Sequence, residues 1–297
     1  MSLVNVLMPV CNAERYIAEA VESILAQTFS DFEFIIVDDG STDGSAGILG
    51  RYGKQDTRIR LISRPNTGIV GALNDGLSQA GGKYVARMDA DDRCRPDRLA
   101  LQVEYLETHS EIVVLGSYAS MIDPDGRLLC PEVKVPLGHE EIEANHLRGL
   151  QTIFHPAAMI RANALKQIGG YRNGYCPAED LDLWLRLGEV GRLANLPARL
   201  FTWRRTFSGV VFTTQHKQGE VLSRILREAW QRRGLSGVPP VPSVSHEGTV
   251  DLWSSFAWIA LRSGCLGSAR RYALRVLLAR PWRPASWRLA YCTLRGR

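Results

Sequence analysis

Three carboxylates follow directly on a short apolar run in the middle of the chain. Residues 84–88 are Tyr-Val-Ala-Arg-Met, and Asp89, Ala90, Asp91 and Asp92 come next. Carboxylates this close together repel one another unless a cation lies between them. Ligands that are all oxygen suit Mg²⁺ or Mn²⁺, usually shared with a substrate phosphate. An acidic turn capping the helix that begins at Pro96 would explain the same residues, because Asp is a favoured N-cap residue.

The first hundred residues alternate strand patterns with helix patterns. Strands are expected at residues 3–8, 32–37, 59–62 and 84–88, and helices at 14–26, 46–52 and 68–80, with Asn12 as the N-cap of the first helix. This alternation predicts an α/β fold with a mostly parallel sheet flanked by helices. Ligands of such sheets bind beyond the carboxyl ends of the strands. Three polar segments lie at these ends, namely residues 9–14, 38–43 and 89–92.

The pattern changes after residue 110. Residues 112–121 and 154–160 are expected to be strands, and Asp123-Pro124-Asp125-Gly126 is a strong turn signal. Ala178-Glu179-Asp180 opens a helix whose apolar positions begin at Leu181. Acids at such a position are stabilised as anions by the helix dipole, so capping alone would account for them. A last strand at 200–203 and a helix at 215–233 complete this part.

The charge is unevenly distributed. Residues 251–297 hold nine Arg, no Lys and one acid, a net charge of +8, so the first 250 residues carry −3 of the total of +5. An acidic body argues against a nucleic-acid partner, which needs basic residues across its binding face. Six widely spaced cysteines without a CxxC pair suggest neither a zinc site nor a disulfide framework. We expect a cytoplasmic protein without a signal peptide or a spanning helix.

The composition of the basic tail fits two different locations, a membrane interface and the surface of the protein body. Four of the seven Trp lie in it, and two apolar stripes separated by Gly264 and Gly267 predict a helical hairpin. Arg together with Trp is typical of a surface that lies at a membrane interface, which would make the protein peripheral at the inner face of the membrane. Packing of the hairpin against the body, with solvated arginines, explains the same residues.

Two common nucleotide-binding motifs are missing from the sequence. A GxGxxG after a strand and a GxxxxGK[ST] loop are both absent, which argues against a dinucleotide site and a P-loop. Instead, several segments in order resemble family-two glycosyltransferases with the A-type fold, over roughly residues 3–210. The segments are Met8-Pro9-Val10-x-Asn12, Val37 to Asp43, Asn66-x-Gly68, Asp89-x-Asp91-Asp92, Arg95 to Leu99, His155-Pro156, Gly169-Gly170-Tyr171 and Ala178 to Trp184.

The resemblance implies how the donor is bound. Asp39 would accept a hydrogen bond from the N–H of a uracil ring, because a carboxylate is only an acceptor. Asp91 would ligate Mn²⁺ or Mg²⁺, and Asp89 would face the ribose or the metal. Asp92 would cap the following helix. The remaining donor-binding residues that the resemblance implies are Pro9, Val10, Asn12, Glu14, Asn66, Gly68 and Ala90.

The resemblance also implies the chemistry. Asp180 would be the general base that takes the proton from the acceptor hydroxyl as this oxygen attacks the anomeric carbon, which inverts its configuration. Glu179 would orient the acceptor or the helix. His155 is expected to be a packed structural histidine, with a catalytic role as the alternative.

The sequence therefore predicts a metal-dependent inverting glycosyltransferase. The donor would be a nucleotide-diphosphate sugar, with UDP as the first carrier expected, and the acceptor a polysaccharide or a lipid-linked glycan. Residues 1–233 would form the catalytic domain, with its nucleotide-sugar half at about 1–110 and its acceptor half at 111–233. Residues 234–250 would be a linker and 251–297 a basic helical tail. The alternative is a catalytically silent protein that binds nucleotide sugars or serves as a scaffold.

Overall fold

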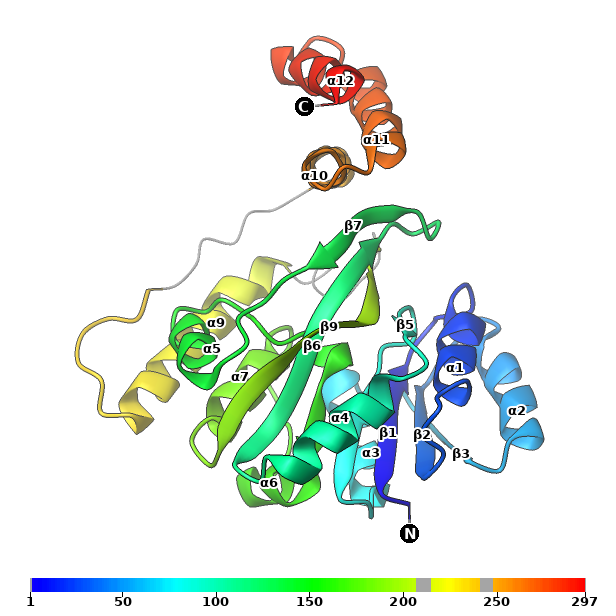
Figure 1. Ribbon diagram of the computed structural model, residues 1–297, viewed down its shortest axis with the longest axis vertical. Coiled ribbons are helices and arrows are strands. Elements are labelled where there is room, and N and C mark those ends of the chain that lie inside the picture. The colour runs from blue at the N-terminus through cyan, green and yellow to red at the C-terminus, as the bar shows by residue number, and fades with distance from the viewer. Residues whose placement is uncertain (1, 207–214, 241–247, 297) are drawn as a thin grey trace.

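The computed structural model describes residues 2–206, 215–240 and 248–296. One nine-stranded sheet runs through the body in the order β3-β2-β1-β4-β8-β6-β9-β5, with β7 paired to β6 (Figure 1). Helices cover both faces of the sheet. This arrangement confirms the α/β class predicted from the sequence.

The first half of the sheet is parallel. Strands β1, β2, β3 and β4 pair with one another in register, and helices connect them on either face. The elements are β1 (Val4–Val10), α1 (Ile17–Leu25), β2 (Phe32–Asp39), α2 (Ser45–Gln55), β3 (Ile59–Arg64), α3 (Ile69–Gln79) and β4 (Tyr84–Arg87). Strand β1 continues one residue past Pro9. Pairing with β4 ends at Leu7, so the missing N–H of Pro9 interrupts no hydrogen bond on that side.

The second half of the sheet is mixed. Strand β6 is parallel to β9 but antiparallel to β7 and β8, and β8 is antiparallel to β4. The elements are β5 (Arg93–Cys94), α4 (Arg98–Thr108), β6 (Ile112–Ile122), β7 (Leu128–Val133), α5 (His139–His146), a 3₁₀ turn (His155–Ala157), β8 (Met159–Arg161), α6 (Ala162–Ile168), α7 (Glu179–Leu187), β9 (Arg192–Arg204) and α9 (Gln215–Arg232).

Two expectations for this half were wrong in detail. Residues 154–160 are not one strand, because Pro156 lies in a 3₁₀ turn and only Met159–Arg161 joins the sheet. The last strand is much longer than 200–203, because β9 runs beside β6 along most of its length. Two hydrophobic cores result, one on each face. Leu49, Leu99 and Met8 belong to one, and Leu73, Leu183 and Leu7 to the other. Successive side chains of β1 therefore point alternately into the two cores.

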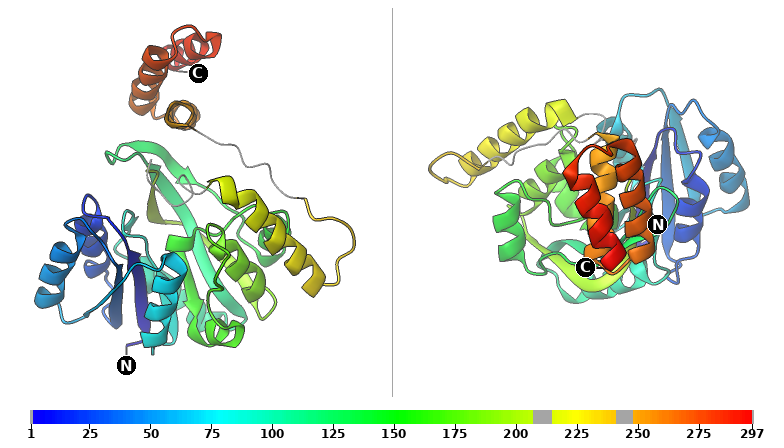
Figure 2. Two further views of the ribbon diagram at one scale, coloured as in Figure 1. Left: turned by 180° about the vertical axis from the view of Figure 1, so that it is seen from behind. Right: turned by 90° about the horizontal axis from the view of Figure 1, so that it is seen from above.

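The tail contains three helices instead of the expected hairpin. They are α10 (Thr249–Arg262), α11 (Leu266–Ala279) and α12 (Pro284–Arg295), and they form a layer at one end of the molecule (Figure 2). The buried positions of α12 are Ser286, Leu289 and Thr293, so two polar residues hide its helical period in the sequence. A third core joins the tail to Met121 and Leu129 of strands β6 and β7.

Polar contacts fix the same junction. The Tyr272 hydroxyl donates to Oδ2 of Asp123 at 2.9 Å, and the Ser268 hydroxyl donates to the carbonyl of Leu128 at 2.7 Å. The packing that the sequence left open is therefore present on the inner side of the tail. Within the described ranges, no helix is both long enough and apolar enough to cross a membrane.

Candidate active site

The three carboxylates after β4 lie together. One oxygen from each of Asp89, Asp91 and Asp92 lies within 4.8 Å of the others. Burial raises the pKa of Asp91 to about 7, with a further contribution from the negative charge of Asp89. The pKa of Asp92 is also raised, by burial and by both neighbouring acids. A compact set of oxygen donors with an unfavourable concentration of negative charge fits a hard divalent cation.

Asp92 does not cap the following helix, so that expectation was wrong. Its Oδ1 accepts the backbone N–H of Arg204 at 2.7 Å, and its side chain is buried. The N-cap of α4 is Asp97. Arg204 also donates from Nε to the carbonyl of Asp91 at 2.7 Å, and its guanidinium lies over the ring of Tyr16. The end of β9 therefore holds the acidic turn in place.

Arg87 is the last residue of β4 and lies two residues before Asp89. It is 2% exposed, and its Nη1 pairs with Oδ1 of Asp89. Its Nε has no hydrogen-bond partner among the described residues. The positive charge of Arg87 opposes the rise that burial causes in the pKa values of Asp91, Glu179 and Asp180. The guanidinium therefore acts on the acids after β4 and on those that open α7.

Asp39 lies at the end of β2, beside the turn that begins α3. Its two carboxylate oxygens accept the backbone N–H groups of Thr67 at 3.1 Å and Gly68 at 2.9 Å. Arg64 pairs with Asp39 at 3.2 Å, which gives that arginine a partner other than a phosphate. A carboxylate has about four acceptor positions, so Asp39 retains capacity for a further donor.

Glycines allow the nucleotide-side loops to approach closely. Gly40 has a φ of +70°, and a Cβ there would meet the backbone nitrogen of Asn66 at 2.7 Å. Gly68 has a φ of +90°, at the N-cap of α3. Asn66 donates from Nδ2 to Sγ of Cys11 at 3.2 Å. The predicted residues at the ends of β1, β2 and β3 are thus brought side by side.

Asn12 and Glu14 connect two of these loops. Oδ1 of Asn12 accepts the backbone N–H of Thr42 at 2.8 Å, and Oε2 of Glu14 accepts that of Gly44 at 2.9 Å. Asn12 is therefore not the N-cap of the first helix, which begins at Ile17 after a turn. Its φ of +52° belongs to the left-handed region, which Asn tolerates better than most residues.

Three predicted donor-site residues have buried side chains. Pro9 and Val10 are buried within β1, and Ala90 belongs to the core beneath the acidic turn. A ligand at this edge would meet the main chain of these residues.

Asp180 lies in the first turn of α7. Its Oδ1 accepts the backbone N–H of Leu181 at 2.8 Å and Nε2 of Gln151 at 2.6 Å. Burial raises the pKa of Asp180 to about 6, although these donors and Arg87 oppose the rise. Burial and the charge of Asp180 raise the pKa of neighbouring Glu179 to about 7. Two neighbouring acids with raised pKa values, of which Glu179 is buried and Asp180 is partly exposed, are typical of groups that exchange protons near neutral pH.

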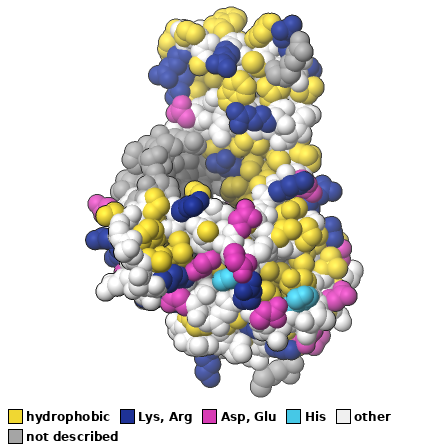
Figure 3. Space-filling view, turned by 60° about the vertical axis from the view of Figure 1, so that its left-hand side comes forward, with side chains coloured by type: hydrophobic (Ala, Val, Ile, Leu, Met, Phe, Trp, Pro, Cys, Tyr) yellow, Lys and Arg dark blue, Asp and Glu magenta, His cyan; other side chains and the backbone are white. Residues whose placement is uncertain are grey.

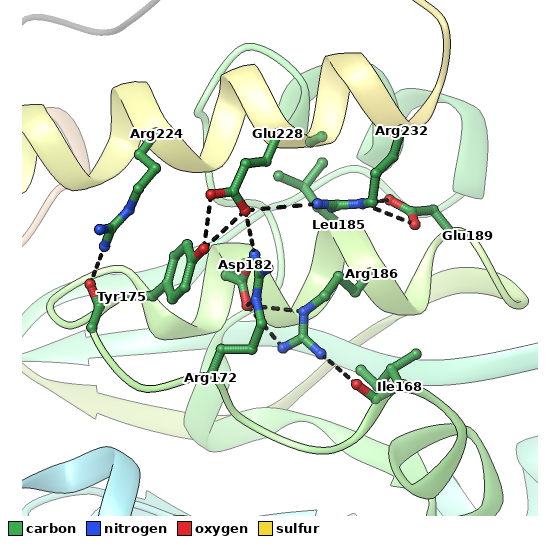
Figure 4. Close-up of polar contacts among 12 residues, drawn as sticks. Ile168, Arg172, Tyr175, Asp182, Leu185, Arg186, Glu189, Arg224, Glu228 and Arg232 are labelled. Atoms are coloured by element: carbon green, nitrogen blue, oxygen red, sulfur yellow. Dashed lines mark hydrogen bonds and ion pairs between the residues drawn. The ribbon is translucent and has the colours of Figure 1, made fainter.

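Helix α7 is anchored by buried charge pairs (Figure 4). Asp182 is 1% exposed on its side chain and accepts from Arg172 at 3.1 Å and Arg186 at 2.9 Å. Arg172 continues to Glu228 of α9 at 2.8 Å, and the Tyr175 hydroxyl reaches the same carboxylate. Helix α9 therefore braces the segment that carries Glu179 and Asp180.

His155 is packed, as the sequence suggested. Its Nε2 lies 2.6 Å from the Tyr171 hydroxyl, and its ring contacts Trp184 edge-on. Burial and the nearby positive charge of Arg87 keep its pKa well below the usual value, so the ring is neutral.

Sequence reasoning missed the position of Gln151 in this site. Gln151 left no signal, since it lies outside regular structure and is brought to Asp180 only by the fold. For Arg87 the sequence left a phosphate contact and a solvated surface position equally open, and the buried guanidinium excludes the solvated position.

Known proteins resemble this chain over most of its length. An uncharacterized glycosyltransferase of Haemophilus influenzae is 34% identical over 76% of this chain and 72% of its own. The putative glycosyltransferase EpsE of Bacillus subtilis is 38% identical over 68% of this chain and 72% of its own. The chondroitin synthase of Escherichia coli is 32% identical over 65% of this chain, which corresponds to 28% of that longer protein.

Solved structures share the fold at low sequence identity. Residues 1–349 of S. aureus TarS, in complex with UDP-GlcNAc, align over all of this chain and 89% of that one, with a TM-score of 0.62 and 18% identity. The mannosyltransferase PcManGT of Pyrobaculum calidifontis, in complex with GDP-Man and Mn²⁺, covers 99% and 85% with a TM-score of 0.60 and 20% identity. A model of the family described as Glycosyl transferase family 2 matches residues 5–169, more than half of the sequence, and the chain belongs to this family.

Proposed function

We propose that this glycosyltransferase is metal-dependent and inverting, and that UDP carries its donor sugar, with dTDP as the next candidate. One observation carries the proposal. The buried guanidinium of Arg87 acts both on an acid after β4 and on the two acids that open α7, because its positive charge opposes the rise in their pKa values. One end of the site thus offers oxygen ligands, and the other a carboxylate with a pKa near neutrality.

The donor would bind at the ends of β1, β2 and β4. Asp91 and Asp89 would hold Mn²⁺ or Mg²⁺, which supplies charge stabilisation to the departing nucleoside diphosphate. Asp39 would accept the imide N–H of the base, and Asn66 and Gly68 would border it. The Mn²⁺ and GDP-Man of PcManGT and the UDP-GlcNAc of TarS support this class of donor.

Asp180 would act on the acceptor. Its carboxylate would accept the hydroxyl proton while the deprotonating oxygen forms a bond to the anomeric carbon and the bond to the diphosphate oxygen breaks. A single displacement of this kind inverts the anomeric configuration. Glu179, whose Oε2 is buried without a hydrogen-bond partner among the described residues, would orient an acceptor hydroxyl.

The acceptor would be a polysaccharide end or a lipid-linked glycan. The names of the relatives, chondroitin synthase and hyaluronan synthase, support a polysaccharide. A cytoplasmic location at the inner face of the membrane fits such an acceptor and belongs to the same proposal. So does the division into a catalytic domain at 1–233, a linker at 234–250 and a tail at 251–297.

A donor screen tests the proposal. Purified protein with Mn²⁺ would be incubated with UDP-, dTDP- and GDP-sugars, and release of the nucleoside diphosphate would be measured. We expect release from one UDP-sugar, lost with EDTA, and NMR of the product should show an inverted anomeric centre. Binding of a UDP-sugar without turnover on any glycan would favour the catalytically silent alternative, and a retained configuration would exclude the single displacement.

A further inference from the structure

The outer side of the tail exposes large apolar side chains on two helices. Leu274 and Leu278 lie one turn apart on α11 and are 56% and 73% exposed. Trp287, Tyr291 and Leu294 follow helical spacing on α12 and are 59%, 57% and 69% exposed, and Trp282 between the helices is 76% exposed. Together these six residues are called the outer face. Their number and size go beyond the isolated exposed apolar residues that are normal for a protein surface.

The inner side of the same helices is already occupied. Tyr272 and Val276 of α11 are buried in the core that includes Leu129 of β7. The hydroxyl of Tyr272 reaches Asp123 of the body. The outer face is therefore not the surface by which the tail packs on the catalytic body.

Positive charge is concentrated in the segment that carries the outer face. The single acid of the tail, Asp251, pairs with Arg280 at 2.5 Å, so it neutralises one of the nine arginines of this segment. Arg262 and Arg288 line a groove of about 480 Å³ between α10 and α12, together with Ser255, Trp258 and Ile259. Figure 3 shows hydrophobic and basic side chains side by side over the tail. Apolar rings among arginines match the boundary between acyl chains and anionic headgroups.

We propose that the outer face docks on the surface of an anionic phospholipid bilayer. Trp282, Trp287 and Tyr291 would enter the headgroup boundary, where an amphipathic ring keeps one end wet and one end apolar. Arg288 and Arg262 would meet lipid phosphates, which are attracted by the surplus positive charge of the tail. A second copy of the chain would repel the tail, because it presents the same positive charge.

The tail lies at the end of the molecule toward which the parallel strands run. In Figure 1, β1 begins near the N-terminus at the bottom, and the three tail helices lie at the top, beyond the carboxyl ends of the strands. A docked tail would therefore hold the acidic turn on the membrane side of the body. This orientation rests on the proposed function, in which the acceptor is carried at a membrane, whereas the docking itself does not.

Co-sedimentation with vesicles tests the docking. The protein with its tail would be mixed with phosphatidylcholine vesicles that contain phosphatidylglycerol, and with vesicles of phosphatidylcholine alone. We expect sedimentation with the anionic vesicles only, weakened by added salt, together with a blue shift of the Trp fluorescence. Equal sedimentation with both vesicles, or with neither, would overturn the proposal.

Two double variants identify the surface. Trp282→Ser with Trp287→Ser should reduce sedimentation to the level of the zwitterionic vesicles. Leu235→Ser with Val238→Ser changes exposed apolar residues outside the tail, which are 44% and 89% exposed, and should sediment like the unchanged protein. If the Trp variant binds vesicles normally, the outer face is not the docking surface. If it instead converts a dimer to a monomer in light scattering, the face is an interface between copies.

The two proposals can fail separately. Vesicle binding needs no donor, metal or acceptor, so it can be present in a protein without turnover. Release of nucleoside diphosphate with a water-soluble acceptor should be the same for the Trp variant and the unchanged protein. Loss of release in both would count against the proposed function and leave the docking intact.

Discussion

Gln151 donates from Nε2 to Oδ1 of Asp180 across 2.6 Å. Asp180 opens α7, whereas Gln151 comes from an irregular segment 29 residues earlier in the chain. A hydrogen bond to the ionised form of a carboxyl favours that form. Gln151 therefore opposes the rise in the pKa of Asp180 that burial causes. The contact therefore favours the ionised form that the proposed base needs.

The first prediction concerns pH. Asp180 can accept a proton only when it is ionised, and its pKa is raised to about 6, so kcat should fall as the pH drops below about 6. Gln151→Leu removes a donor to the ionised form and should move this fall to higher pH. The kcat–pH profile measures the shift. Gln79→Leu, at an exposed glutamine on α3, is the matched control, and a profile unchanged by Gln151→Leu would show that the contact does not tune the base.

The second prediction concerns the metal. Asp91→Ala removes one ligand of the proposed cation. Loss of a residue that only supports a metal ligand usually costs about 10–100-fold in affinity, so loss of the ligand itself should reduce UDP affinity in calorimetry by at least about 10-fold. EDTA should reduce the affinity of the unchanged protein in the same way and have little further effect on the variant. Asp31→Ala, at an exposed acid before β2, serves as control. If Asp91→Ala binds UDP in the absence of metal as tightly as the unchanged protein does with metal, a metal bridge to the donor is contradicted.

The third prediction concerns the brace behind α7. Glu228→Gln removes the negative charge that Arg172 and Tyr175 contact, although Arg172 keeps its pair with Asp182. The free energy of unfolding should fall by about 1.5–3 kcal/mol, the usual range for a hydrogen bond to a charged group. Urea unfolding measures this change. Glu220→Gln changes an exposed acid of the same helix and should have no effect. If Glu220→Gln lowers the free energy of unfolding by as much, the effect comes from loss of any negative charge on α9 and not from the contacts of Glu228.

Much of the fold could be predicted because its signals are local. Residues 4–10, 32–39 and 84–87 are mostly apolar runs that end in polar residues or are closely followed by them, and the alternation of strands with helices sets their parallel order. The carboxyl ends of neighbouring parallel strands share an edge, which is why Asp39 and Asp91 could be grouped from the amino-acid sequence alone. Helix α12 was missed because two of its three buried positions are polar, whereas its apolar Trp287, Tyr291 and Leu294 are exposed.

The rest of the site depends on contacts between distant segments. Asp92 has the sequence context of a helix cap, yet its carboxylate accepts from Arg204, 112 residues later. Asn12 likewise has the sequence context of a helix cap, yet its side chain binds the loop after β2. Local preference gives Asp and Asn a short list of roles, and only the long-range pairing of β9 with β6 and of β1 with β2 selects among them.

Asp180→Asn tests the central claim most directly, with kcat and UDP affinity measured on the same sample. Asn has nearly the shape of Asp but cannot take a proton at neutral pH, while Asp39, Asp91 and a metal ion make up the proposed donor site. We predict that kcat falls roughly 10²–10⁴-fold, the share a general base usually supplies, with donor KM and UDP affinity little changed. Glu140→Gln, at an exposed acid in the first turn of α5, should keep full turnover. Near-normal turnover in Asp180→Asn would contradict the account, because Asp180 would then be only a helix-terminal acid. Loss of UDP binding would contradict it in another way, by placing Asp180 in the donor site.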